Sequence, residues 1–115
     1  MDAKIIIIMN KESFIEIAIE HGEAIKIGDS KKANKLHSKL TKIYESAQGE
    51  IERNEELKQI SHHSNQNVKL WAAAFLLKED TDYARQILYD IKESGTVFSL
   101  SASTILDMWN KGMWG

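Results

Sequence analysis

The 115-residue chain contains no cysteine and no proline. The absence of cysteine excludes a disulfide framework, a zinc ribbon and a thiol nucleophile. A chain without cysteine fits a reducing compartment, and we expect the cytoplasm. The absence of proline means that no helix loses a backbone donor or meets a ring clash, so the sequence permits long unbroken helices.

The chain also lacks a strong net charge and a long hydrophobic run. Its formal net charge is only −2 at pH 7, which gives no general attraction to nucleic acid or to an anionic membrane. The apolar run from Ile5 to Met9 is far shorter than the roughly 18 residues of a membrane span and has no secretory cleavage pattern. We therefore expect no membrane association. Residues 1–10 form an apolar lead-in, in which residues 5–8 fit a strand or a helix equally.

The composition fits one globular domain. Hydrophobic residues make up 43% of the chain and charged residues 28%, values typical of a folded domain and not of a disordered chain. A chain of this length buries roughly 65% of its unfolded surface around one core. We therefore expect a single domain over residues 1–115.

Apolar residues recur at helical spacing along most of the chain and predict an all-α fold of about six helices. Gly28 and Gly112 mark helix ends, because glycine readily adopts the left-handed conformation that closes a helix. A very short link separates the first two helices, so we expect them to pack as an antiparallel hairpin. The predicted helices span residues 11–27, 31–48, 50–60, 65–78, 82–93 and 102–111.

Polar residues stand where several of these helices begin. Asn10 is suited to cap the first helix, Asp29 or Ser30 the second, and Ser64 the fourth. Such side chains accept hydrogen bonds from backbone amides that have no partner inside the helix. The predicted starts therefore rest on capping as well as on periodicity.

The fourth predicted helix is the most apolar part of the chain. Between Val68 and Leu77 every residue except Lys69 is apolar, and a helix that is apolar all round must be enclosed by others. The third helix is weaker, with Ile51 as the first of its few expected apolar anchors. The fourth helix is therefore expected to form the centre of the fold.

Six helices could form a closed bundle or a short α-solenoid. The stretch "NVKLWAAAFLL", followed by "ARQILYDI", favours the solenoid. A basic residue near the helix start, then small residues and two leucines, resemble the second helix of a HEAT or armadillo repeat, although no fixed repeat length is detectable elsewhere. We expect a hairpin over residues 11–48 and HEAT-like helices over residues 50–112, in antiparallel pairs of a HEAT/armadillo-like α-α superhelix.

Three segments carry a family resemblance: "FIEIAIEHGEAIKIGDSKKANKLHSKL", "NVKLWAAAFLL" and "FSLSASTILDMWNKG". Together they resemble a family of small bacterial helical domains of unknown function with a HEAT-like α-α superhelical fold, over roughly Phe14 to Gly112. The matching positions are Gly22, Glu23, Ala24, Gly28, Asp29, Ala33 and Asn34, then Val68, Leu70, Trp71, Ala72 and Ala73, and finally Trp109 and Gly112. The resemblance implies a fold and no reaction. For proteins of this general type it implies partner binding or toxin neutralisation, although Lys69 replaces the family's usual arginine and weakens any inference of a bidentate contact there.

The four histidines are the first candidates for catalysis or metal binding. His62 and His63 are consecutive, so on a regular element they point in different directions, and no Cys, Asp or Glu lies in the ten residues that follow. His21 and His37 stand equally far from Asp29 in the sequence, which predicts that they oppose each other across the hairpin. No carboxylate is evident as a third ligand. We therefore expect packing or hydrogen-bonding roles, with no metal and no cofactor.

No other pattern predicts catalysis. The serines of "SHHS" and "SLSAS" lack a glycine elbow and an acid-base pair at a meaningful spacing, and helix capping explains them. The glycines of "GEAIKIGDSKK" are too far apart for a phosphate loop and follow no strand. The sequence therefore predicts a protein that is not an enzyme.

Charge is unevenly distributed over the first two predicted helices. The acidic ridge consists of Glu12, Glu16, Glu20 and Glu23, and the lysine ridge consists of Lys31, Lys35, Lys39 and Lys42, with Lys32 beside them. Each ridge covers an arc of about 80° on a regular helix, and both also fit ordinary solvated surfaces. The acidic ridge suits a basic protein such as a nuclease toxin, since complementary charge raises the association rate. The lysine ridge could contact phosphates but has no interleaved arginine or aromatic residue, so nucleic acid ranks below a protein partner.

The tail "MWNKGMWG" ends in an aromatic residue beyond the helix stop. Trp114 could fold back onto the core or stay exposed as a partner or self-association site.

The sequence as a whole predicts a non-catalytic protein-binding module. The most specific form of this prediction is a bacterial immunity protein that neutralises a basic toxin domain. The alternative is a helical-repeat module that contacts nucleic acid through the lysine ridge. The partner-binding residues are the acidic ridge, Lys31, Lys35, Lys39 and Trp114, and the oligomeric state stays open.

Overall fold

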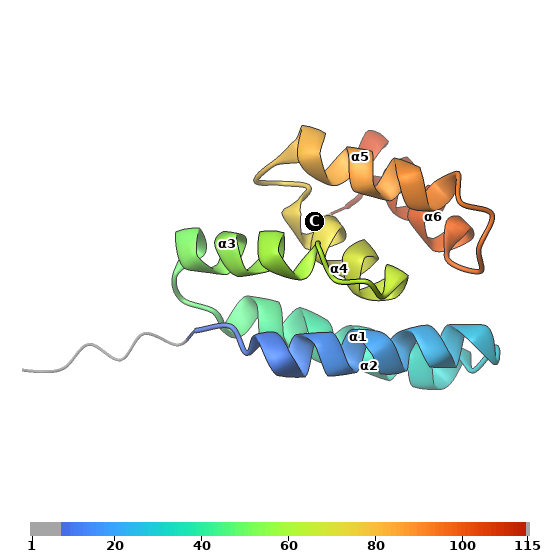
Figure 1. The fold of residues 1–115 in the computed structure, drawn as a ribbon, viewed down its shortest axis with the longest axis horizontal. Helices are drawn as coiled ribbons and strands as arrows, with labels where there is room; N and C mark the ends of the chain where they lie inside the picture. The colour runs from blue at the N-terminus through green and yellow to red at the C-terminus, as the bar shows by residue number, and fades with distance from the viewer. Residues whose placement is uncertain (1–7, 115) are drawn as a thin grey trace, which may run out of the picture.

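The computed structural model describes residues 8–114 of the chain. Within this range the chain forms six α-helices and no strand (Figure 1), which confirms the predicted all-α class. The helices are α1 (Lys11–Lys26), α2 (Ser30–Ser46), α3 (Glu50–Ile60), α4 (Gln66–Leu76), α5 (Thr81–Lys92) and α6 (Ser99–Asn110). Among these residues, no helix is both long and apolar enough to cross a membrane. The choice between strand and helix for residues 5–8 falls outside the described residues, except for Ile8, which belongs to neither.

Local hydrogen bonds and one glycine explain how α1 and α2 begin and end. The Asn10 side chain accepts a hydrogen bond from the Ser13 amide at 3.1 Å, and the Asp29 side chain accepts one from the Lys32 amide at 3.1 Å. Each bond satisfies an amide that has no partner within its own helix. Gly28 follows α1 with φ of 72°, a conformation that costs a residue with a Cβ atom more than it costs glycine.

The helices lie in three tiers in the view of Figure 1. The lowest tier contains α1 and α2, the middle tier α3 and α4, and the upper tier α5 and α6. The two helices of each tier pack against one another, and α4 also packs against α1 and α5. The central helix therefore joins the three tiers.

The predicted enclosure of α4 is confirmed. Eight of its 11 residues are buried, among them Leu70 at 0% and Trp71 at 6% exposure. Ala72, Ala73 and Ala74 are buried as well, and such small side chains let neighbouring helices approach closely. Full burial of one large apolar side chain contributes about 1.5–3 kcal/mol relative to its exposure. The α4 residues therefore form the centre of the hydrophobic core.

The prediction that Ile51 anchors α3 in the core is wrong. Its side chain is 73% exposed, whereas Leu57 and Ile60 of the same helix are buried. Ile51 precedes Ile60 by nine residues, which places the two on opposite sides of a helix with about 3.6 residues per turn. The fully buried residues of α3 are therefore Leu57 and Ile60.

Two predicted helix starts are also wrong. α4 is capped by Asn65 instead of Ser64, because the Asn65 side chain accepts hydrogen bonds from the amides of Asn67 and Val68. α6 begins at Ser99, three residues before the predicted start at residue 102. The Phe98 ring just before it is 6% exposed and lies against α1 near Gly22, so packing anchors the first turn of α6.

Candidate functional site

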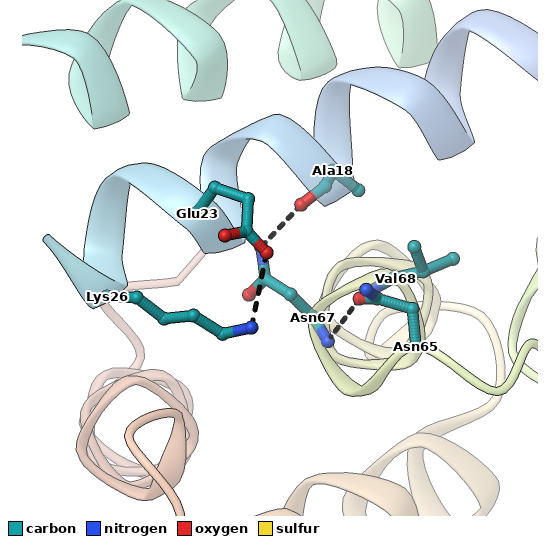
Figure 2. A network of polar contacts seen from close by, with 6 residues as sticks. All are labelled: Ala18, Glu23, Lys26, Asn65, Asn67 and Val68. Atoms are coloured by element: carbon teal, nitrogen blue, oxygen red, sulfur yellow. Dashed lines mark hydrogen bonds and ion pairs between the residues drawn. The ribbon is translucent and has the colours of Figure 1, made fainter.

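The acidic ridge lies on the solvent side of α1. Its four glutamates are all exposed. Glu23 forms an ion pair with Lys26 at 3.2 Å, which Figure 2 shows at the end of α1. Glu12, Glu16 and Glu20 have no ion-pair partner within residues 8–114. Three carboxylates over successive turns are therefore left uncompensated by the described part of the chain.

The lysine ridge lies on the solvent side of α2. Lys31, Lys35 and Lys39 are exposed, as are the flanking Lys32 and Lys42. In the described residues none of the five side chains forms an ion pair. α2 contains these five lysines and a single glutamate, Glu45. The helix is therefore strongly basic on its outer side.

Trp114 folds back onto the core. Its Nε1–H donates a hydrogen bond to the Ala74 carbonyl at 3.0 Å, and its ring centroid lies 6.4 Å from that of Trp71. The side chain is half-buried, whereas the preceding Met113 is 66% exposed. Of the two alternatives for the tail, folding back or staying exposed, the structure shows the first, with the indole covering α4.

An aromatic groove lies between α2, α4 and the folded-back tail. Its volume is about 250 Å³, and its described lining consists of His37, Thr41, Tyr44, Glu45, Ala74, Phe75, Lys78 and Trp114. Tyr44 and Phe75 are stacked with centroids 4.7 Å apart and planes at 16°. The Arg53 guanidinium lies 4.2 Å from the Tyr44 ring centroid. Burial raises the pKa of Tyr44 despite the opposing charge of Arg53, so the phenol stays neutral.

His21 and His37 both contact Trp71. The His37 ring lies 4.6 Å from the Trp71 ring, and the His21 ring lies 5.2 Å away in an edge-on arrangement. The Trp71 Nε1–H points to His21 Nδ1 at 3.3 Å. Because an indole N–H can only donate, His21 Nδ1 must accept, and the proton of the neutral ring lies on Nε2. Residues 8–114 contain no group of three His, Cys, Asp or Glu side chains arranged to hold a metal ion.

The surroundings of His21 keep its ring neutral. Burial, with a smaller contribution from the charge of nearby His37, lowers the pKa of His21 to about 4. Burial likewise lowers the pKa of His37. Removal of an imidazolium from water is unfavourable, and a second cation close by adds repulsion. Both rings therefore act as neutral packing and hydrogen-bonding groups near pH 7.

Asn67 is a buried polar residue that the sequence did not single out. It is 1% exposed, and its Nδ2 donates to the Ala18 carbonyl at 2.7 Å, as Figure 2 shows. The same Nδ2 lies 3.0 Å from His21 Nδ1, which ties α4 to α1. Asn67 precedes Trp71 by four residues, and residues at this spacing share a helix face. The four-residue spacing from a tryptophan expected in the core is the sequence signal that could have identified Asn67 as buried.

The consecutive histidines have separate surroundings. His63 Nδ1 accepts a hydrogen bond from the Asn65 amide at 2.9 Å, so it supports the turn before α4. His62 is exposed and lines a cleft of about 450 Å³ beside Tyr83. Tyr83 Oη lies 2.6 Å from Ser61 Oγ, and Ser61 Oγ in turn donates to the Lys58 carbonyl at 2.5 Å. The two rings do not form one site.

Comparison with family models, with curated proteins and with solved structures finds no match for this chain. The resemblance to small bacterial HEAT-like domains therefore stays a prediction. The candidate site is therefore identified from geometry alone. Its parts are the two charged ridges on α1 and α2, the aromatic groove, and a buried network centred on His21 and Trp71.

Proposed function

We propose that this chain is a non-catalytic protein-binding module whose acidic ridge binds a basic protein. The observation that carries the proposal is the exposure of Glu12, Glu16 and Glu20 without an ion-pair partner in residues 8–114. Uncompensated charge of one sign raises the local concentration of an oppositely charged partner and accelerates encounter. Neutralisation of a basic toxin domain in the bacterial cytoplasm is the sharpest version of this function.

The inner side of α1 supports such a role. Phe14 and Ala18 are fully buried, and the Ala18 carbonyl accepts the hydrogen bond from Asn67. The acidic ridge therefore stands on a helix that is held by core packing and by a buried polar contact. A surface fixed before binding loses less conformational entropy when the partner arrives.

The proposal includes a HEAT/armadillo-like superhelix of antiparallel pairs. Its support is that helices adjacent in the sequence pack together as α1 with α2, α3 with α4, and α5 with α6. Successive helix pairs that each contact their neighbours are the unit of such solenoids. Solenoids commonly bind partners through extended concave surfaces.

The proposal also excludes catalysis. Its support is the state of the two histidines beside Trp71. His21 Nδ1 is occupied by Trp71 and lies within hydrogen-bonding distance of Asn67, and the half-buried His37 packs on the Trp71 ring. A general base needs a free nitrogen within hydrogen-bond reach of a substrate proton. In His21 that nitrogen already serves the contact between α1 and α4.

Charge reversal on the acidic ridge tests this proposal. A basic protein is first captured from the native cell by the wild-type chain. Its association rate constant is then measured with the wild-type chain and with the double variant Glu16→Lys/Glu20→Lys. We expect its association rate constant to fall about tenfold or more at low salt, with a smaller difference at high salt where charges are screened. A toxin domain encoded beside this chain is the first protein to test.

A matched control separates ridge contacts from net charge. Glu55→Lys/Glu93→Lys changes the net charge equally at two exposed positions on α3 and at the end of α5, where neither residue has an ion pair in the described chain. The proposal expects association within about threefold of wild type for this control. Equal losses in the two double variants would contradict a specific role for the ridge.

The second candidate function is nucleic-acid contact through the lysine ridge. The observation that favours it is that all five lysines of α2 are exposed and form no ion pair in residues 8–114. Phosphate contacts weaken steeply with salt, because binding releases counterions. A salt-sensitive gel shift of short DNA or RNA, lost in Lys35→Glu/Lys39→Glu, would favour this candidate. No shift at low salt would remove it.

A further inference from the structure

The cleft that His62 lines lies between the turn after α3 and the helices α4 and α5. Its volume of about 450 Å³ falls within the roughly 300–1,000 Å³ of common small-molecule sites. Ile87 and Ile91 of α5 supply an apolar part of the lining, and polar or charged side chains supply the rest. In small-molecule sites, apolar contacts bury the ligand and a few polar groups fix its orientation. The cleft therefore has room for a small molecule and groups of both kinds.

Lys69 is a half-buried cation that lines this cleft from α4. It forms no ion pair within residues 8–114. Lys11, which is half-buried as well, pairs with Glu56 at 3.7 Å. Charges that are withdrawn from water are usually paired, because their desolvation is costly. The Lys69 ammonium is therefore available to an anionic group that enters the cleft.

Asp90 lines the same cleft from α5. The Gln86 amide donates to Asp90 Oδ1 at 2.9 Å, and Asp90 forms no ion pair in the described part of the chain. Lys69 and Asp90 thus line one cleft without pairing with each other. A ligand that carries both a carboxylate and an ammonium group can neutralise both side chains at once.

Other charges near the cleft leave this balance unchanged. The Lys58 ammonium lies 5.5 Å from the ring centroid of the lining residue Tyr83, but it pairs with Asp80 at 2.8 Å. His62 is exposed, so water and salt screen any charge on its ring. The opposite charges of Lys69 and Asp90 therefore dominate the recognition of a bound molecule.

Polar contacts fix two walls of the cleft before a ligand arrives. Ser61 Oγ donates to the Lys58 carbonyl at 2.5 Å, so Tyr83 is the donor in the 2.6 Å contact between the two hydroxyl groups. The Gln66 amide donates to Ser94 Oγ at 3.1 Å. Side chains that are already held lose less conformational entropy on binding.

We infer that this cleft binds a small zwitterion, namely an α-amino acid with an apolar side chain. Its carboxylate contacts Lys69, its ammonium group contacts Asp90, and its side chain packs against Ile87 and Ile91. An α-amino acid is the simplest biological molecule that combines these three features. This inference goes beyond the proposed function, because the cleft involves α4 and α5 and not the acidic ridge of α1.

The two charges of the cleft select against ligands with a single charge. A simple anion attracted by Lys69 is repelled by Asp90, and a simple amine attracted by Asp90 is repelled by Lys69. Unfavourable contacts of this kind contribute to specificity as much as favourable ones do. A molecule with both charges gains both attractions and leaves neither side chain unpaired.

The test is an NMR titration of the ¹⁵N-labelled full chain with four small molecules. L-Leucine is the probe, N-acetyl-L-leucine lacks the ammonium charge, L-leucine amide lacks the carboxylate, and glycine lacks the apolar side chain. L-Leucine should shift the amide signals of the cleft residues in a saturable way. The other three should bind at least about tenfold more weakly, since each loses one of the three contacts.

Two substitutions assign the contacts. Lys69→Met keeps the apolar stem of the lysine, and Asp90→Asn keeps the shape of the carboxylate. Each should weaken L-leucine about tenfold or more. Lys69→Met should also abolish the preference for L-leucine over its amide, and Asp90→Asn the preference over N-acetyl-L-leucine, because each pair of changes removes the same contact. Lys92→Met and Asp82→Asn are the matched controls: both residues are exposed on α5 without an ion pair in residues 8–114, and affinity should stay within about threefold.

The outcomes separate this inference from its alternatives. It is overturned if L-leucine causes no saturable shift, if the shifted signals lie outside the cleft, or if any of the other three molecules binds as tightly as L-leucine. Wild-type affinity in a folded Lys69→Met or Asp90→Asn variant overturns it as well. The same spectra show whether each variant is folded, and if one is not, the four molecules on the wild-type chain decide. Glu16→Lys/Glu20→Lys should bind L-leucine as wild type does, so failure of the acidic ridge proposal leaves this test intact.

Discussion

α3 and α4 have the same length of 11 residues but opposite environments. α4 buries eight residues, whereas α3 buries only Leu57 and Ile60. Polar contacts attach the end of α3 to its neighbours, including the ion pair between Lys58 and Asp80 at 2.8 Å. Helices of equal length can therefore be held in place by different interactions. Burial on nearly all sides holds α4, whereas a narrow apolar stripe and polar surface contacts hold α3.

The difference shows where this chain can tolerate change. An enclosed helix transmits a substitution to every neighbour, because protein interiors are close-packed. An exposed helix side loses only local contacts, and surface substitutions are usually within about 0.5 kcal/mol. Substitutions on the outer surfaces should therefore cost less stability than substitutions in the enclosed centre.

Trp71→Ala should have the largest effect. The indole is 6% exposed and contacts His21, His37, Phe75 and Trp114. Loss of the ring leaves a cavity and should lower the free energy of unfolding by about 3–5 kcal/mol. Urea denaturation followed by far-UV circular dichroism measures this change. A variant with wild-type stability would show that α4 is not the centre of the core.

Acidification should destabilise the contact between α1 and α4. The pKa of His21 falls from its usual 6.5 to about 4 in the folded chain, so between these values the unfolded chain binds more protons. Stability is therefore fully present above pH 6.5 and declines as the pH falls toward 4, by up to about 1.4 kcal/mol per unit. Urea midpoints measured across this window test the slope.

The variant His21→Gln is the control for this pH dependence. Its amide oxygen can accept a hydrogen bond but does not titrate in this range. We expect a smaller slope, with a remainder from His37, whose pKa is lowered in the same direction. An unchanged slope in His21→Gln would assign the pH dependence to other groups.

Truncation after Gly112 should have an intermediate effect. It removes the half-buried Trp114, its hydrogen bond to Ala74 and its contact with Trp71. A lost hydrogen bond together with partial apolar burial predicts a loss of about 1–2 kcal/mol in the free energy of unfolding. Thermal melts of the full and truncated chains measure it. Unchanged stability with lost self-association would instead make the tail an interaction site.

Ile51→Ser should have the smallest effect. The side chain is 73% exposed, so the substitution removes little buried apolar surface. We expect a change within about 0.5 kcal/mol, measured by the same urea titration as for Trp71→Ala. A loss of several kcal/mol would place Ile51 in the core and remove the contrast between α3 and α4.

Local signals predicted much of the fold. Asn10 and Asp29 cap helices as expected, Gly28 has the expected positive φ, and the apolar run of α4 is buried. Each of these depends on neighbouring residues in the sequence, through capping, glycine conformation or helical periodicity. The Ile51 prediction failed because its nine-residue spacing from Ile60 places the two side chains on opposite sides of α3. The Ser64 prediction failed because Ser64 and Asn65 are adjacent residues that can both cap a helix.

The candidate site was less accessible to sequence reasoning. The exposure of the acidic and lysine ridges follows from helical spacing, and their roles remain predictions. The aromatic groove combines Tyr44, Phe75 and Trp114 from three separate segments, so no local pattern indicates it. Asn67 and His21 likewise meet across 46 residues of sequence. Such juxtapositions depend on how the tiers pack, which periodicity alone does not specify.

Native-state hydrogen exchange gives the most direct test of the claim that α4 is an enclosed core and that the outer surfaces are free to bind. The backbone amides of α4 should exchange only through global unfolding, with a free energy equal to that from urea denaturation. The amides of the first turns of α3 should exchange through local opening at a clearly lower free energy. Equal and low protection in both helices would contradict the enclosure of α4 and, with it, the division between core and binding surfaces.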